Sequence, residues 1–337
     1  MTVNTSQTAP GAVRQYTCPW CGAVSDGTQS TCPSCGASVS IQARIDDAGW
    51  TQAPGSKDMA RLQFGHSDCQ VEGVYVPVAD VGLAQGDSVY FAHHVLLWKD
   101  TQVTISTMSI KGAWKRMLAG MPVIMTQAHG PGHIAFSRDA PGEMVALPLQ
   151  HGQSVDVREH IFVVATGQVQ YDYFQTNIWL RTRKEGSDNE TEMHYPIGMY
   201  MDRFSAPQVP GLVLLHASGN VFVRTLAAGQ MILVKPTAML YKDHTVQMQL
   251  HFEHPNGLGF LTGMMGPNLS VSVNLGGALG MLNSLGQMGD LIASYGQRYI
   301  WLALTGPGRV AIQSASESIE GESAYIVGCS SATHHRW

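Results

Sequence analysis

Three stretches of the sequence carry the same apolar pattern when they are aligned, without gaps, on Gly86, Gly152 and Gly229. Apolar residues stand three, five, eleven and seventeen positions after each glycine, and most residues at the even positions between them are polar. These residues are Val89, Phe91, Leu97 and Val103; Val155, Val157, Val163 and Val169; and Ile232, Val234, Leu240 and Val246. A period of two is typical of strands with one buried face. The alignment therefore predicts three related β units whose apolar positions are buried on corresponding faces.

A second pair of strands is predicted beside this pattern. Gly132-His133-Ile134-Ala135-Phe136 is similar to Gly219-Asn220-Val221-Phe222-Val223, and Gly308-Arg309-Val310-Ala311-Ile312 begins a shorter third copy. An apolar strand is expected before each, over residues 121–126, 211–215 and 299–304. Gly130-Pro131-Gly132 and Gly306-Pro307-Gly308 favour tight turns. Short strands joined by such turns predict an all-β fold, an antiparallel sandwich or barrel built from related repeats.

The N-terminal region contains two copies of one cysteine knuckle, Cys18-Pro19-Trp20-Cys21-Gly22 and Cys32-Pro33-Ser34-Cys35-Gly36. Two residues between cysteines let both sulfurs reach one ion, and the following glycine allows the left-handed turn that a knuckle needs. We expect Cys18, Cys21, Cys32 and Cys35 to bind one structural zinc ion (Zn²⁺), since four thiolates leave no open coordination position. A redox-active cysteine pair is the weaker alternative, because the knuckle is duplicated. Cys69 and Cys329 stand alone and are expected to be buried as small hydrophobic residues.

Several blocks of the main domain resemble a known family. They are Met117-Leu118-Ala119-Gly120, His129-Gly130-Pro131-Gly132, Leu149-Gln150-His151-Gly152, Gly211-Leu212-Val213-Leu214-Leu215-His216-Ala217-Ser218-Gly219 and Leu304-Thr305-Gly306-Pro307-Gly308. In this order they look like the altered-inheritance-of-mitochondria family, member twenty-four, over roughly residues 59–316. The resemblance implies a fold like that of the tryptophan RNA-binding attenuator protein, assembled as a homo-oligomer, with a trimer as first expectation. It offers no catalytic residues. The zinc ribbon and a long insertion depart from the family's pattern.

The predicted organisation follows from these motifs. Residues 1–17 are expected to be a disordered N-terminus, 18–36 the zinc ribbon, 37–58 a linker, 59–325 the repeated β domain and 326–337 a tail. The insertion, residues 255–296, is rich in Gly and Met, and we expect either a loop packed on its own sheet or an exposed contact surface. Lys111, Lys115 and Arg116 flank Trp114, which suggests a peripheral membrane contact, although a crossing between repeats is the favoured interpretation.

Composition limits the classes of partner. Charged residues make up only 13% of the 337 residues and the net charge is -5, so self-association is favoured and nucleic acid is not an expected partner. Residues 1–15 lack the apolar core of a signal peptide, and no apolar run is long enough to cross a membrane. We expect a cytoplasmic protein whose thiols stay reduced and bind metal.

No catalytic motif emerges from the sequence. Although the chain has 14 histidines, His93 and His94 are adjacent, so on a strand they would face opposite sides. His129 and His216 are expected to occupy equivalent structural positions in two repeats. The favoured hypothesis is a non-enzymatic oligomeric β scaffold whose ribbon docks an unidentified protein partner. The alternatives are a protein that binds RNA or a small ligand, suggested by fold analogy, and a cupin-like metal-dependent enzyme.

Overall fold

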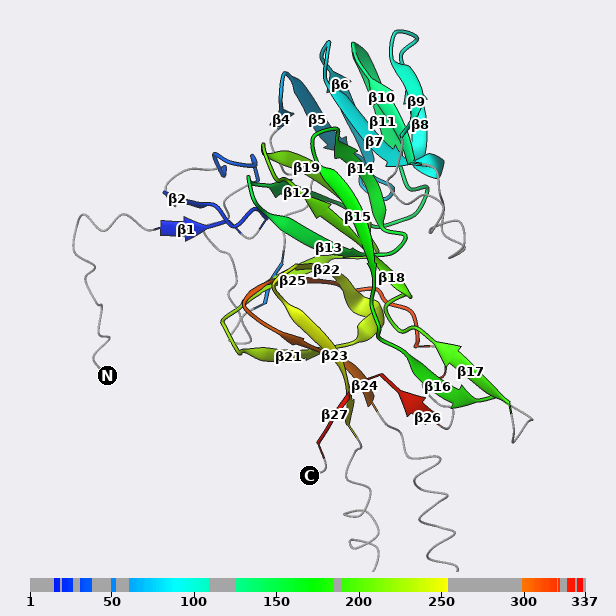
Figure 1. Ribbon diagram of the computed structural model, residues 1–337. Helices are drawn as coiled ribbons and strands as arrows, with labels where there is room; N and C mark the ends of the chain where they lie inside the picture. The colour runs from blue at the N-terminus through cyan, green and yellow to red at the C-terminus, as the bar shows by residue number, and fades with distance from the viewer. Residues whose placement is uncertain are drawn as a thin grey trace, which may run out of the picture.

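The computed structural model is built of β-strands (Figure 1). It describes residues 15–18, 20–26, 31–37, 50–52, 61–108, 125–184, 190–253, 299–319, 321, 326–330 and 332–335. Within these ranges the only helical elements are two short 3-10 turns, η2 (His93–Val95) and η3 (Pro236–Ala238). No helix in the described ranges is long and apolar enough to cross a membrane. The predicted all-β class is confirmed.

Eighteen of the strands form three units of six, which follow one another from top to bottom (Figure 1). Unit 1 contains β6 (Val78–Leu83), β7 (Ser88–Ala92), β8 (Leu96–Lys99), β9 (Thr104–Met108), β10 (Met125–His129) and β11 (Gly132–Ser137). Unit 2 contains β12 (Glu143–Leu149), β13 (Ser154–Arg158), β14 (Phe162–Thr166), β15 (Gln170–Gln175), β18 (Tyr200–Ser205) and β19 (Gly211–Ala217). Unit 3 contains β20 (Val221–Leu226), β21 (Met231–Val234), β22 (Met239–Asp243), β23 (Gln247–Glu253), β24 (Tyr299–Thr305) and β25 (Gly308–Gln313).

All three units share one antiparallel pairing scheme. The sixth strand of each unit lies between the first and third, as β11 does between β6 and β8, β19 between β12 and β14, and β25 between β20 and β22. The fifth strand lies between the second and fourth, as β10 does between β7 and β9, β18 between β13 and β15, and β24 between β21 and β23. Each unit therefore supplies two three-stranded halves. Aromatic pairs join the halves: the ring centroids of Phe91 and Phe136 are 4.8 Å apart in unit 1, and those of Phe162 and Phe204 are 4.7 Å apart in unit 2.

Neighbouring units join by sharing sheets. Strand β7 of unit 1 pairs with β14 of unit 2, and β13 of unit 2 pairs with β22 of unit 3. Each sheet has two end strands in the described part of the chain, so the sheets form open, packed layers and do not close into a barrel. The barrel alternative of the sequence prediction is thus not realised, because the units extend along the molecule.

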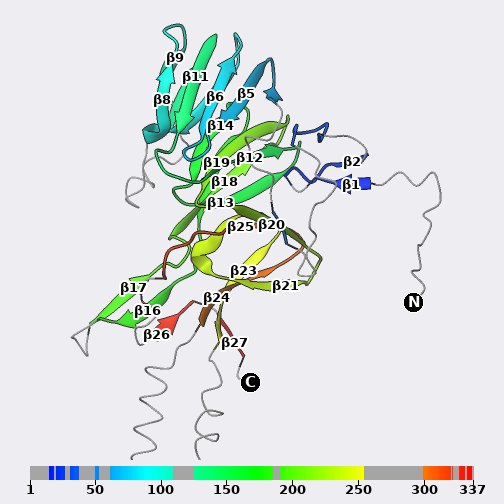
Figure 2. The same cartoon turned by 180° about the vertical axis from the view of Figure 1, so that it is seen from behind.

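The remaining strands extend these layers. They are β1 (Gln15–Thr17), β2 (Val24–Asp26), β3 (Thr51–Gln52), β4 (Leu62–Phe64), β5 (Ser67–Glu72), β16 (Leu180–Arg183), β17 (Thr191–His194), β26 (Ile326–Cys329) and β27 (Ala332–His335). Strands β4 and β5 extend the sheet of β6, β11 and β8 on the side of β6. Strand β3 pairs with β20 at the end of another sheet. Strand β27 runs parallel to β23, and β16, β17 and β26 form a separate small sheet (Figure 2).

The three alignment glycines occupy the same turn. Gly86, Gly152 and Gly229 have φ values of 90°, 81° and 75°, in the left-handed region that glycine adopts without a steric penalty. The residue after each glycine donates its backbone N–H to the carbonyl three residues earlier: Asp87 to Ala84 (3.2 Å), Gln153 to Gln150 (2.9 Å) and Gln230 to Ala227 (3.0 Å). The turns thus lead from the first to the second strand of every unit.

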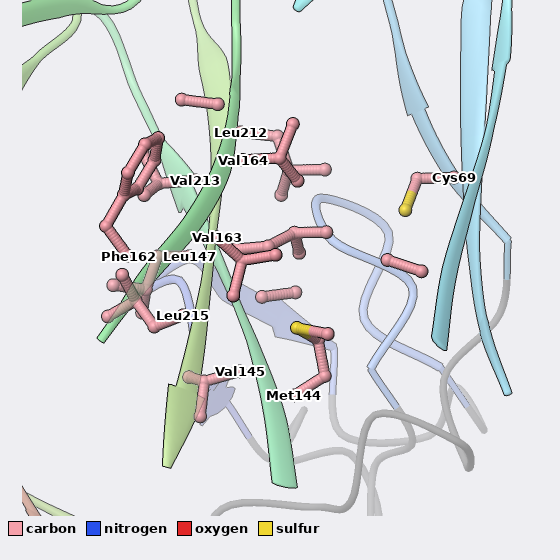
Figure 3. Packing of buried hydrophobic residues seen from close by; sticks show 14 of the residues in the cluster. Cys69, Met144, Val145, Leu147, Phe162, Val163, Val164, Leu212, Val213 and Leu215 are labelled. Carbon is pink, nitrogen blue, oxygen red and sulfur yellow. The ribbon is translucent and has the colours of Figure 1, made fainter. Parts of the chain in front are cut away.

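Most of the predicted apolar positions are buried. Val89, Val155 and the other residues of the pattern have relative exposures of 5% or less, except Leu97 and Ile232. Leu97 is 55% exposed, and Ile232 is only half-buried. Figure 3 shows part of the buried hydrophobic cluster. In unit 2, Leu147, Phe162 and Leu215 pack together from the neighbouring strands β12, β14 and β19. The two exceptions lie on β8 and β21, each of which is the end strand of its sheet among the described residues.

One part of the strand alignment is wrong. The segments beginning at Gly132 and Gly308 are both sixth strands, β11 and β25, as expected. The segment beginning at Gly219 instead leads into β20, the first strand of unit 3. Alternation of apolar and polar residues marks any strand with one buried face, so it does not distinguish a first strand from a sixth.

Some predicted boundaries also differ from the structure. Strand β1 lies within the N-terminus predicted as disordered, residues 1–17, because it pairs with β2. Strand β3 lies within the predicted linker, residues 37–58, and β26 and β27 lie within the predicted tail, residues 326–337. Strands β3, β26 and β27 gain backbone hydrogen bonds from partners far away in the sequence. The insertion at 255–296 and the basic stretch from Lys111 to Arg116 lie outside the described residues.

Candidate metal centre

The two cysteine knuckles fold in the same way. Gly22 donates its backbone N–H to the Cys18 carbonyl at 2.9 Å, and Gly36 donates to the Cys32 carbonyl at 2.8 Å. Both glycines are left-handed, with φ values of 70° and 72°. A side chain would be strained at these positions, so the glycine after each cysteine pair is required by the backbone. Local sequence thus turns each pair of sulfurs toward the same point.

The four sulfurs of the knuckles form one compact group. Cys18 Sγ lies 3.6 Å from Cys35 Sγ, and Cys21 Sγ lies 3.8 Å from Cys32 Sγ. All four sulfurs lie within 4.8 Å of one another, and all four residues are buried. A tetrahedral ion with metal–sulfur distances of about 2.3 Å would place its sulfurs about 3.8 Å apart. The group therefore has the dimensions of a four-thiolate metal site, as the sequence predicted.

Without a metal ion, the thiols of this group differ in the direction of their pKa shifts. The pKa of Cys21 is lowered to about 2, mainly because the thiols of Cys18 and Cys35 stabilise its thiolate by hydrogen bonds. The pKa of Cys18 is raised to about 12, chiefly by its hydrogen bond with Cys21, and that of Cys35 is raised as well. A bound divalent cation favours the thiolate form at every ligand, because its charge outweighs repulsion among the sulfurs.

The ribbon rests directly on the β domain. Arg309 of β25 donates from Nη1 to the Trp20 carbonyl at 3.1 Å, while its guanidinium also holds Asp243. Gln150 donates to Ser34 Oγ at 3.2 Å. Trp20 is 1% exposed and belongs to the same buried cluster as the core of units 1 and 2. The ribbon is therefore packed on the domain, although the predicted linker at residues 37–58 suggested that it would fold apart.

The remaining cysteines and histidines give no second group of metal ligands in the described part of the chain. Cys69 is 1% exposed and burial raises its pKa to about 12, as expected for a buried small hydrophobic residue. Cys329 is half-buried on β26. His93 and His94 lie in the 3-10 turn η2 and not on a strand.

The predicted equivalence of His129 and His216 is wrong. His129 lies on β10, the fifth strand of unit 1, whereas His216 lies on β19, the sixth strand of unit 2. His216 Nε2 contacts the Ala140 carbonyl at 3.0 Å, and burial lowers its pKa. The similar sequence around the two residues reflects two strands of the same period.

A polar cavity where the three units meet was not predicted. It has a volume of about 420 Å³ and is lined by Arg138, Arg158, His160, His216 and residues of β17, η3 and β25, among them His194, Thr237 and Gln313. The Arg158 guanidinium donates to the Thr237 carbonyl. Arg138 Nη1 is buried and has no hydrogen-bond partner among the described residues. Burial, and then the nearby arginines, lower the pKa of His160. No spacing in the sequence joins these residues, because they come from separate strands.

Comparisons with known proteins identify the relatives of this chain. A search of curated proteins gives no significant match. Among solved structures, the chain is similar to the X-ray crystal structure of a Streptococcus pyogenes protein, with 17% identity and a TM-score of 0.47. That similarity covers 74% of this chain and 94% of the other. The model of the family described as "Mitochondrial biogenesis AIM24" matches residues 69–315, which include most of all three units. The chain therefore belongs to the mitochondrial biogenesis AIM24 family.

Proposed function

We propose that this chain is a non-enzymatic scaffold that assembles with copies of itself and docks a protein partner beside a zinc-bound ribbon. The observation that carries the proposal is the closed four-sulfur group fixed on the β domain. Four ligands from one chain leave no position at which a substrate could bind the ion, so the metal has a structural role. Zinc is the metal that best suits four thiolates in tetrahedral positions.

The docking surface is a groove between the ribbon and the β domain. It has a volume of about 830 Å³ and runs from the second knuckle, at Pro33 and Ser34, past Phe64 and Gln150 to Val209. Val209 is 41% exposed at this groove. An apolar side chain rimmed by polar groups is typical of a protein contact surface. Metal binding would hold the second knuckle in place as one wall.

Metal analysis and affinity capture of the native chain test this proposal together. We expect one zinc ion per chain and a set of captured proteins that Val209→Asp removes, because an aspartate would place a charge in the apolar contact. Tyr75→Asp is the matched control, since Tyr75 is 82% exposed and does not line the groove. Less than one equivalent of metal, or capture that Val209→Asp leaves unchanged, would argue against the ribbon as a docking element.

The polar cavity favours a second candidate function, the binding of a small anionic ligand. Arg138 supplies a buried N–H group without a partner among the described residues, and Arg158 lies in the same cavity. A guanidinium in this position suits a carboxylate or phosphate group. The cavity is too small for a nucleic-acid chain, so a small molecule is the ligand class that fits it best.

Titration with inorganic phosphate, followed by calorimetry, tests this candidate. We expect Arg138→Gln to weaken phosphate binding by about tenfold or more, as for the loss of a charged hydrogen bond. Arg61→Gln is the control because the side chain of Arg61 is 60% exposed and lies away from the cavity. Equal affinity in wild type and Arg138→Gln would exclude the cavity as the site of binding.

A further inference from the structure

Two strand pairs, β7 with β14 and β13 with β22, connect neighbouring units, and we call each of them a joint. Both joints have the same register. In the first joint, the residues three, four and five positions after Gly86 pair with those fourteen, thirteen and twelve positions after Gly152, as Val89 does with Thr166. In the second joint, the same positions after Gly152 pair with the same positions after Gly229, as Val155 does with Asp243. The second strand of one unit therefore joins the third strand of the next by a fixed rule.

A hydrogen bond at the end of each joint follows the same rule. Gly167 donates its backbone N–H to the Ser88 carbonyl at 2.7 Å in the first joint. His244 donates to the Ser154 carbonyl at 3.4 Å in the second. Both donors stand fifteen positions after the alignment glycine of their unit, and both acceptors stand two positions after theirs. The backbone groups of the joint are therefore placed alike in both cases.

In the described part of the chain, the rule leaves two strands with a neighbour on one side only. Strand β8, the third strand of unit 1, ends one sheet, and β21, the second strand of unit 3, ends another. They lie apart, β8 in the upper part of the molecule and β21 in the lower part of both views (Figures 1 and 2). One molecule thus carries both halves of a joint, well apart from each other.

Side chains on these two edges are exposed where their counterparts are buried. The central residues of β7 and β13 are buried, and so are most residues of β14 and β22. By contrast, Leu97 and Trp98 of β8 are 55% and 44% exposed, and Met231 and Leu233 of β21 are 48% and 38% exposed. The exceptions to the predicted burial, Leu97 and Ile232, lie on these edges. Unpaired apolar edge strands readily pair with another chain.

We propose that β21 of one copy of this chain pairs with β8 of a second copy, in the register of the two internal joints. Ile232 would lie opposite Asp100 of the second copy, Leu233 opposite its Lys99 and Val234 opposite its Trp98. The N–H of Thr101 would donate to the Met231 carbonyl across the contact. The half-sheet of β21, β24 and β23 and the half-sheet of β8, β11 and β6 then form a third six-stranded arrangement like the two within the chain.

This contact is head to tail, because its two surfaces differ and lie on separate parts of one molecule. Each added copy satisfies one edge and presents another, which gives a ring if the rotation closes and a longer chain if it does not. The inference rests on the self-assembly part of the proposed function, and it names the strands and the register. A different protein would have to supply the same spacing of apolar groups, whereas a second copy already carries it.

Leu233 offers a sharp test, because its counterpart in the second joint is Asp156, which pairs with Lys242 at 2.7 Å. Leu233→Lys would place a second ammonium opposite Lys99, and we expect assembly, measured by light scattering and sedimentation, to weaken by about tenfold or more. Leu233→Asp would recreate the Asp156–Lys242 pair and should retain assembly. Adding Lys99→Glu to Leu233→Lys should restore it.

The control is Met193→Lys, since Met193 is 40% exposed on β17, away from both edges. Circular dichroism confirms that each variant is folded. An oligomer that Leu233→Lys leaves unchanged would overturn this contact and leave the scaffold proposal standing. A wild-type chain that is monomeric at every concentration would overturn both.

Cross-linking separates contact between copies from closure within one chain. Val234 and Trp98 would form a pair without mutual hydrogen bonds, for which a Cα separation of about 4.5 Å suits a disulfide. Mixing the single variants Val234→Cys and Trp98→Cys under mild oxidation should yield a covalent dimer, whereas Val234→Cys mixed with Met193→Cys should not. A bond formed within single chains of the double variant, without covalent dimer in the mixture, would overturn the proposal.

Discussion

Replacing Cys32 with serine should abolish tight metal binding and unfold the ribbon, the largest effect expected for a single substitution in this chain. Cys32 is 1% exposed, and its sulfur lies 3.8 Å from that of Cys21. A ribbon of this size has too little core to fold alone, so metal binding supplies folding free energy of about 10 kcal/mol. A hydroxyl in place of a thiolate removes one of the four ligands.

The loss should extend to the β domain, because the ribbon covers part of it. Unfolding would expose the surface against which Trp20 packs and release Arg309 from the Trp20 carbonyl. Burial of one large side chain contributes about 1.5–3 kcal/mol, so a lower melting temperature is expected for the whole chain. Metal analysis and thermal unfolding measure the two effects. Cys329→Ser, a half-buried cysteine outside the ribbon, should leave the metal content unchanged. Full metal content in Cys32→Ser would contradict the assignment.

The four-cysteine group was predictable because its geometry is local. Each knuckle needs only two cysteines and one glycine within five residues, and the backbone bonds of Gly22 and Gly36 lie inside the knuckles themselves. Its attachment to the domain was not predictable. Arg309 and Trp20 are 289 residues apart, and no pattern in either segment points to the other.

The three units were predictable for a different reason. Alternating apolar residues mark a buried strand face wherever it occurs, and a shared glycine turn fixed the alignment at Gly86, Gly152 and Gly229. The same generality caused the wrong assignment of the segment at Gly219, since a first and a sixth strand carry the same alternation. The departure of Leu97 and Ile232 from burial also depends on sheet order, which no local pattern specifies.

The joints explain why strands in the same position of two units are buried in one unit and exposed in the other. Inside the chain, β14 is buried along its whole length because β7 and β19 lie on its two sides. Strand β8 has the same position in its unit but a neighbour on one side only, among the described residues. Identical backbone schemes thus give core at the inner joints and exposed apolar side chains at the outer edges, which is the arrangement that the proposed self-assembly needs.

The inner joint of units 2 and 3 depends on a buried ion cluster, and Asp156→Ala should be the second most damaging substitution. Asp156 is 0% exposed; Arg203 donates to it from Nε at 2.6 Å and from Nη2 at 3.0 Å, and Lys242 Nζ donates at 2.7 Å. Lys242 is 3% exposed, so removing Asp156 leaves a buried ammonium without its carboxylate. The expected loss of unfolding free energy is about 3–5 kcal/mol. Glu192→Ala, an exposed acidic residue on β17, should change stability by less than about 0.5 kcal/mol.

The pH dependence of the Asp156→Ala defect distinguishes a lost charge pair from lost packing. Burial lowers the pKa of Lys242 from 10.5, while Asp156 opposes that shift, so the substitution should lower the pKa further. The unfolded chain then binds more protons than the folded variant up to about pH 10.5, and the stability of the variant rises with pH. Denaturant unfolding should therefore show a defect that shrinks as the pH rises from 7 towards 10. Replacing the buried pair, as in Asp156→Leu with Lys242→Met, should recover most of the loss because no buried ammonium remains without a carboxylate, while the Arg203 side chain is 36% exposed and reaches water. A defect that is constant with pH and persists in the double variant would mean that the pair contributes only through its volume.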